Sequence, residues 1–218
     1  MPSSHPEVLF LGLDLTSSPE RPSAAALLRG RKVEAFFLPR EDEEILALAR
    51  IFRPHLVAVD SPLGFPQGLC CLEESCSCRP LSPLPGRICE RELLRRGIPC
   101  FFTTKRSIIK EMVYRALKLR SSLEAEGLKV IEVYPYATKV ILLGRKMPKK
   151  SKREGLEFLR RSLLVLFENL SPFSIFLSHD LADALLAAYT AYLHFLGRTE
   201  ILGIEEEGQI VIPQRAPL

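Results

Sequence analysis

Short apolar runs bounded by turn-forming residues constrain the fold of this 218-residue chain more than any other feature. Three of these runs follow one another directly, and Pro19, Pro22 and Gly30 mark the turns between them. Later runs are separated by stretches with helical spacing. The expected strands are residues 7–15, 24–29, 32–38, the run ending at Asp60 and residues 129–134. Three strands with short links predict an antiparallel meander. The later strands alternate with helices, so they are expected to be parallel strands of the same sheet.

Helical patterns lie between and after these strands. In residues 153–169, for example, Leu156, Leu159 and Leu163 recur on one helix face. The expected helices are residues 41–52, 87–96, 105–125, 136–143, 153–169 and 180–196, and residues 200–212 are expected to form an edge hairpin. The pattern predicts a single α/β domain over residues 1–218, with a mixed sheet flanked by helices. An irregular loop rich in Pro, Gly, Ser and Cys is expected at about residues 61–86.

The composition is that of an ordinary globular protein, with 47% hydrophobic and 26% charged residues. No apolar stretch is long enough to cross a bilayer. The first residues lack the basic and apolar segments of an export signal. We therefore expect no membrane partner and a cytoplasmic location.

Three acidic residues occupy strand positions where a charge is costly unless it is paired or bound to a metal. Asp14 lies near the end of the first strand, and alternation points its side chain away from the face of its two leucine neighbours. Asp60 ends the fourth strand, where ligands bind in open α/β sheets. Glu132 lies inside the fifth strand, where Glu is disfavoured. Turn formation by the two aspartates, and pairing of Glu132 with a Lys or Arg, are the structural alternatives.

Asp180 and Asp183 stand three residues apart at the start of the last long helix, so they share one helix face. Helix capping, with Asp180 at the cap and Asp183 in the first turn, explains such a pair by itself. Capping does not explain the alanines at positions 182, 184, 187, 188 and 191. Small side chains let a helix approach a sheet closely, which predicts that Asp183 lies near the strand-borne acids.

These carboxylates have the properties of a site for one or two divalent cations, because neighbouring carboxylates repel one another without a cation. Mg²⁺ or Mn²⁺ held by Asp14, Asp60 and Asp183 would activate a water molecule for phosphodiester hydrolysis. The candidate catalytic residues are Asp14, Asp60, Glu132, Asp180 and Asp183.

Basic residues are concentrated between Arg145 and Arg153, where six of nine positions are Lys or Arg. Such a cluster suits the phosphate backbone of DNA or RNA. The alternative is an ordinary solvated helix face. The candidate nucleic-acid contacts in this cluster are Lys149, Lys150, Lys152 and Arg153.

All six cysteines fall between residues 70 and 100. We expect Cys71, Cys76, Cys78 and Cys89 to bind a zinc ion or an iron–sulfur cluster that orders the loop beside Asp60. Their spacing is not that of paired CxxC motifs, so disulfides and free thiols are the alternatives.

Several short blocks resemble the RNase H-like superfamily and, within it, the RuvC-type nucleases. Most of the chain is similar to a domain-of-unknown-function family described as predicted nucleases with an RNase H fold. The matching blocks are Gly12 to Leu15, Ala58 to Gly64, Arg87 to Arg91, Glu132 to Pro135 and Asp180 to Leu185. The chain departs from the RuvC pattern in carrying Asp rather than Glu at residue 60, and in the long loop that follows.

The resemblance implies that Asp14, Asp60 and Asp183 are metal ligands, with Asp180 and Glu132 as further candidates. It also implies that Arg87, Glu90 and Arg91 form a pocket edge, where the arginines would hold phosphate oxygens. An exposed Arg–Glu pairing is the structural alternative for these three residues.

Two other functions fit parts of the pattern. An ATP-handling enzyme of the related actin-like superfold would use Asp14 and the following Thr16-Ser17-Ser18 for phosphate and Mg²⁺, but the chain lacks a later glycine-rich phosphate loop. A catalytically silent nucleic-acid-binding protein would need only the basic cluster. Binding that weakens in high salt, with no product formed, would favour the second of these functions.

Overall fold

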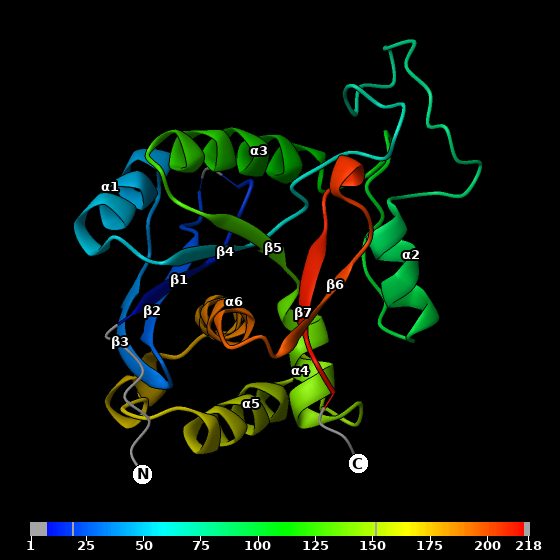
Figure 1. The fold of residues 1–218 in the computed structure, drawn as a ribbon. Coiled ribbons are helices and arrows are strands. Elements are labelled where there is room, and N and C mark those ends of the chain that lie inside the picture. The colour runs from blue at the N-terminus through cyan, green and yellow to red at the C-terminus, as the bar shows by residue number, and fades with distance from the viewer. Residues whose placement is uncertain (1–7, 19, 151, 216–218) are drawn as a thin grey trace.

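The computed structural model describes residues 8–18, 20–150 and 152–215 of the chain. A seven-stranded sheet in the order β3-β2-β1-β4-β5-β7-β6 forms its centre (Figure 1). The strands are β1 (Leu9–Asp14), β2 (Ala24–Arg29), β3 (Lys32–Phe37), β4 (Leu56–Asp60), β5 (Val130–Val133), β6 (Thr199–Leu202) and β7 (Ile210–Pro213). β2 is antiparallel to β1 and β3, whereas β1, β4, β5 and β7 are parallel from neighbour to neighbour. The predicted mixed sheet, with three antiparallel strands followed by parallel strands and flanked by helices, is confirmed.

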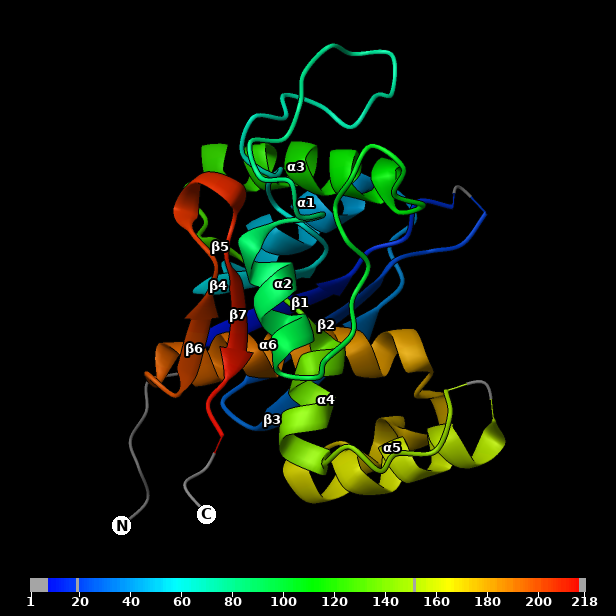
Figure 2. The same ribbon diagram turned by 90° about the vertical axis from the view of Figure 1, so that its right-hand side faces the viewer.

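Helices cover both faces of this sheet. They are α1 (Asp42–Phe52), α2 (Ile88–Arg95), α3 (Lys110–Ala125), α4 (Pro135–Leu143), α5 (Arg153–Leu166) and α6 (His179–Phe195), with short 3-10 turns at Ser171–Phe176 and Glu205–Glu207. α1 and α3 lie on one face, and α6 crosses the other face with α5 beyond it (Figures 1 and 2). The part of the chain that the structure describes contains no helix that is both long and apolar enough to cross a membrane.

Alternation along β1 divides its side chains between the two layers of the core. Leu11 and Leu13 pack with residues of α1 and α3, whereas Phe10 packs with alanines of α6. The same alternation places Asp14 on the α6 face, because Asp14 is an even number of residues from Phe10. The hydrophobic pattern of β1 thus decides which layer its terminal carboxylate faces.

Two segments differ from the elements expected from the sequence. The helix expected over residues 105–125 begins only at Lys110, because residues before it form turns in which the Ser107 amide donates to the Thr104 carbonyl at 3.0 Å. The helix expected over 153–169 ends at Leu166, and Phe167 is already extended. Neither difference moves a candidate site residue out of its element.

Residues 61–87, which join β4 to α2, contain neither helix nor strand. This segment leaves the sheet at Asp60 and extends away from the rest of the molecule (Figures 1 and 2). A loop of this length without secondary structure is uncommon in a compact fold and is usually functional or held by specific contacts.

Candidate metal centre

Asp14 and Asp60 lie side by side at the carboxyl ends of two neighbouring strands. β1 and β4 are parallel, and their register pairs Asp14 directly with Asp60. Paired residues on adjacent strands point to the same face, and Ala58, two residues before Asp60, packs with α6. Both carboxylates therefore face α6. They also line a cavity of about 240 Å³, to which Tyr134 contributes.

α6 approaches these carboxylates closely because its contact surface is made of small residues. At Gly12 of β1, a Cβ atom would lie 2.1 Å from the Ala184 carbonyl oxygen and 2.3 Å from the Ala188 amide nitrogen. Only glycine fits at such a distance. Asp183 precedes Ala184 and is only 6% exposed. The alanine-rich face of α6 thus brings a third carboxylate to the two on the strands.

The electrostatics show that the three carboxylates lie close together. Burial and the negative charges of Asp183 and Asp180 together raise the pKa of Asp14 to about 7. Burial also raises the pKa of Asp60 well above its usual range, with Asp14 and Asp183 adding to the effect. Such shifts are expected where carboxylates share a site without enough positive charge. Carboxylate oxygens are also the ligands that Mg²⁺ and Mn²⁺ prefer.

Two lysines supply part of the missing positive charge. Lys139 Nζ lies 2.5 Å from Asp183 Oδ1, and Lys150 Nζ lies 3.2 Å from Asp183 Oδ2 and 3.8 Å from Asp180 Oδ1. Each of the two carboxylate oxygens of Asp183 therefore contacts a cation.

Lys139 was not among the residues predicted from the sequence. It lies in the apolar α4 between Thr138 and Val140, and its side chain is only 11% exposed. A lysine inside a buried helix is rare unless it is paired. Its position among apolar residues is therefore the feature of the sequence that could have indicated a role for Lys139. Lys150 was predicted to contact nucleic acid, and here its ammonium group is paired with Asp183.

Asp180 lies at the margin of the site. Its side chain is 55% exposed, and it stands in the first turn of α6. The predicted capping alternative is wrong in detail, because Ser178 is the N-cap and its hydroxyl accepts from the Leu181 amide at 3.1 Å. Asp180 is therefore not needed as the helix cap.

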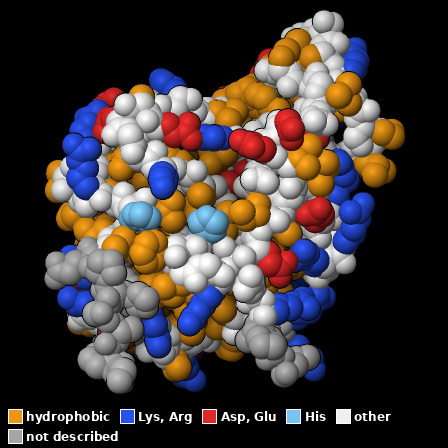
Figure 3. All heavy atoms as spheres, in the orientation of Figure 1, with side chains coloured by type: hydrophobic (Ala, Val, Ile, Leu, Met, Phe, Trp, Pro, Cys, Tyr) orange, Lys and Arg blue, Asp and Glu red, His pale blue; other side chains and the backbone are white. Residues whose placement is uncertain are grey.

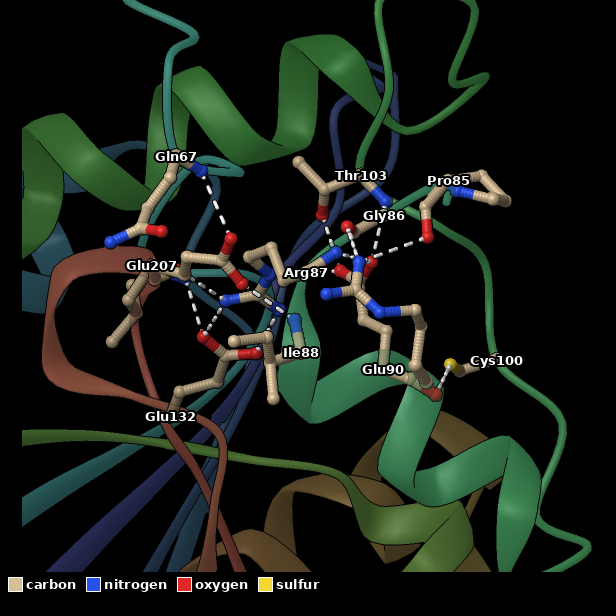
Figure 4. A network of polar contacts seen from close by, with 12 residues as sticks. Gln67, Pro85, Gly86, Arg87, Ile88, Glu90, Cys100, Thr103, Glu132 and Glu207 are labelled. Carbon is tan, nitrogen blue, oxygen red and sulfur yellow. Dashed lines mark hydrogen bonds and ion pairs between the residues drawn. The ribbon is translucent and has the colours of Figure 1, made fainter. Parts of the chain in front are cut away.

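Glu132 lines the same cavity as Asp14 and Asp60, but its carboxylate is held in an ion pair. The register pairs Glu132 with Val59, whose side chain packs in the layer of α1 and α3, so both point away from α6. Glu132 instead binds Arg87 through two contacts of 2.6 and 2.8 Å and accepts from the Leu63 amide at 2.7 Å (Figure 4). The structure thus shows the pairing with an arginine that was the structural alternative for Glu132, at a position that lines the cavity of Asp14 and Asp60.

Arg87 is the centre of a buried polar network at the start of α2. Its guanidinium group also donates to Glu90 Oε1 at 2.9 Å and to the Glu207 carbonyl at 3.4 Å, and it is fully buried (Figure 4). Arg87 and Glu90 also line the cavity of Asp14 and Asp60, and the Arg87 guanidinium group is held there by Glu90 and Glu132. Arg91 donates to the Pro85 and Gly86 carbonyls and so holds the end of the loop.

A basic groove lies beside Asp183, on the side of α6 away from the sheet. It has a volume of about 310 Å³. Its lining includes Lys139, Arg145, Lys149, Lys150 and His179. Of the other residues predicted to contact nucleic acid, Lys152 is exposed and the Arg153 side chain is 91% exposed. The groove places exposed positive charge next to the acidic residues.

The mixed sheet, with carboxylates at the ends of β1 and β4 and on α6, defines an α/β protein with a carboxylate cluster. The chain belongs to the family described as "Protein of unknown function (DUF429)", which matches residues 12–207. This finding confirms the family relationship predicted from the sequence blocks.

Among solved structures, the chain is similar to RuvC from Thermus thermophilus, with 17% sequence identity and a TM-score of 0.48. The similarity covers 87% of this chain and 97% of that chain. No curated protein matches the chain.

Proposed function

We propose that this protein is a divalent-metal-dependent nuclease that hydrolyses phosphodiester bonds in nucleic acid. The observation that supports this proposal is the meeting of Asp14, Asp60 and Asp183, from three different elements, in one cluster where burial and the neighbouring carboxylates raise the pKa values of Asp14 and Asp60. Close carboxylates that are shielded from water lower the stability of the fold. Such groups are therefore found mainly at functional sites.

The proposed roles follow from the position of each group. Asp14 and Asp60 offer oxygen ligands from the strand ends, and Asp183 offers ligands from α6. Bound Mg²⁺ or Mn²⁺ would supply an activated water and stabilise charge on the phosphate oxygens. Lys150, whose side chain is 59% exposed, is placed to contact a phosphate when its pairing with Asp183 is released. Asp180, which is exposed at the margin of the site, would be a further ligand of the same metal ion.

The basic groove supports nucleic acid as the substrate class. Lys149 and Lys150 of its lining stand beside Asp183, so a phosphate backbone in the groove would reach the carboxylate cluster. Lys and Arg contact phosphates regardless of base sequence, and such contacts position a strand without selecting its sequence.

The test is cleavage of labelled single-stranded, duplex, branched and DNA–RNA hybrid substrates in Mg²⁺ and in Mn²⁺. We expect products that depend on the metal and fall by at least about 10–100-fold in Asp183→Asn, because a metal ligand is lost. Glu43→Gln is the matched control: it removes the same charge from an exposed position of α1, where the side chain is 76% exposed.

A second measurement separates binding from catalysis. Mn²⁺ should raise the unfolding temperature of the wild type and of Glu43→Gln, but not that of Asp183→Asn. Absence of products from the wild type on every substrate would overturn the nuclease proposal. Salt-sensitive binding without products would instead identify a nucleic-acid-binding protein that lacks catalysis.

A further inference from the structure

Four cysteines come together in the loop between β4 and α2, although their spacing in the sequence is irregular. This cysteine cluster consists of Cys70, Cys71, Cys76 and Cys78. All four sulfur atoms lie within 4.8 Å of one another, and the Sγ atoms of Cys70 and Cys76 are 3.7 Å apart. The loop here has no helix or strand, so secondary structure does not impose this convergence.

We propose that the cysteine cluster binds a single zinc ion. Zinc held by four thiolates at about 2.3 Å in tetrahedral geometry separates its ligands by about 3.8 Å, and the Cys70–Cys76 separation agrees with this value. An iron–sulfur cluster holds its thiolates on different iron atoms and so spreads them further apart. The compact arrangement therefore favours one ion. This site is separate from the carboxylate cluster and does not depend on the proposed nuclease activity.

The ligand set differs from the one expected from the sequence. Cys89 is fully buried in a core cluster with Leu93 and Ile98, and it belongs to α2. Cys70 takes the fourth position instead. The expectation that Cys89 is a ligand is corrected, because α2 directs its side chain into the protein core.

Neighbouring basic groups suit the charge of such a site. Four thiolates and one Zn²⁺ carry a net charge of two negative units, which is costly unless cations lie nearby. Arg79 donates to the carbonyls of Cys76 and Cys78 at 3.1 and 2.9 Å, and Lys105 Nζ donates to the Cys76 carbonyl at 2.5 Å. Both cations thus reach the backbone of the cluster, as the supporting partners of metal ligands commonly do.

The base of the loop is anchored independently of the cysteines. The Leu72 amide donates to the Tyr114 hydroxyl at 2.7 Å, and that hydroxyl donates to Glu73 at 3.0 Å. Lys110 also pairs with Glu73 at 2.9 Å, and Leu72 is fully buried. These contacts fix the segment between Cys71 and Cys76 against α3, so a zinc ion would hold the part that extends beyond it. In the space-filling view this part stands out from the body and carries hydrophobic side chains on its surface (Figure 3). Leu81 and Leu84 of the loop are 75% and 53% exposed.

The test is the metal content and coordination of the full chain, purified under reducing conditions. We expect one zinc ion per chain, and X-ray absorption should show sulfur ligands at about 2.3 Å. Co²⁺ exchanged into the site should give the thiolate charge-transfer absorption that carboxylate ligands do not produce. Cys76→Ser should lose more than about tenfold in zinc affinity, whereas Cys100→Ser, outside the cluster, should retain the wild-type content.

Two further measurements keep the result clear if Cys76→Ser folds poorly. Removing zinc from the wild type with a chelator should increase hydrogen exchange within residues 66–86 and leave the sheet protected. Asp183→Asn should keep its zinc, because that variant alters only the carboxylate cluster. The proposal is overturned by a wild type without zinc, by oxygen ligands, by iron with inorganic sulfide, or by a Cys70–Cys76 disulfide under these conditions.

Discussion

Glu132 and Arg87 form a buried ion pair that joins β5 to the start of α2. Both side chains are at most 3% exposed, and Glu90 supplies a second carboxylate to the same guanidinium group. Thr103 donates to Glu90 through both its amide and its hydroxyl, which fixes the next segment of the chain as well. At the scale of single residues, this network is structural: it holds the start of α2 against β5 and holds the segment at Thr103 against α2.

Glu132→Gln should therefore lower the free energy of unfolding by about 3–5 kcal/mol, because it leaves the Arg87 charge buried without its main partner. Urea denaturation measures this change, with Glu43→Gln as the surface control. At temperatures where the variant stays folded, its Mn²⁺-induced stabilisation should match that of the wild type. Loss of the Mn²⁺ effect in a stable variant would mean that Glu132 is a metal ligand after all.

At the scale of elements, the contact between α6 and β1 sets the geometry of the carboxylate cluster. α6 begins at the Ser178 cap and places Asp183 one turn later, opposite the strand ends. Its alanines meet β1 at Gly12, where the helix backbone fills the space that a side chain would need. The distance between Asp183 and the strand aspartates is thus determined by residues that carry no functional group.

Gly12→Ala should separate α6 from β1, because its Cβ would overlap the backbone of α6. We expect a loss of about 1–3 kcal/mol in stability, as for overpacked cores, together with weaker Mn²⁺ stabilisation of the folded state. Thermal unfolding with and without Mn²⁺ measures both effects.

Gly197→Ala is the control for this substitution. Gly197 has a left-handed backbone but no neighbour within 4 Å of an added Cβ, so it should lose stability through strain alone and keep the metal response. An unchanged Mn²⁺ response in Gly12→Ala would show that the helix position does not control the site.

At the scale of the whole molecule, charge is distributed unevenly around the sheet. The basic groove includes Lys139 and Lys150, which pair with Asp183 of α6, and α3 covers the opposite face. A nucleic-acid strand bound in the groove would release counterions, so its affinity should fall steeply as salt concentration rises.

Replacing both Lys149 and Lys152 with Ala should weaken binding at every substrate sequence and reduce the slope of log K against log salt by about 2 in magnitude. Fluorescence anisotropy across a salt series measures the slope. The control replaces Lys118 and Lys129, which are exposed on the α3 side, and should leave the slope unchanged. Equal effects of the two pairs would show that the basic groove does not guide the nucleic acid.

The sequence alone determined most of the elements and three members of the carboxylate cluster. Hydrophobic periodicity is local, so β1, β4 and α6 could be placed from their own residues, and Asp14, Asp60 and Asp183 with them. The alanines of α6 also predicted that this helix packs closely against the sheet.

Only the tertiary structure decided which groups meet. Glu132 lines the same cavity as Asp14 and Asp60 but faces Arg87 and not α6, because one step along a strand moves a side chain to the other face. Lys139 of α4 pairs with Asp183 of α6. Cys70, and not Cys89, joins the cysteine cluster because of the path of an irregular loop. These contacts join residues far apart along the chain or depend on loop geometry, for which local pattern carries no signal.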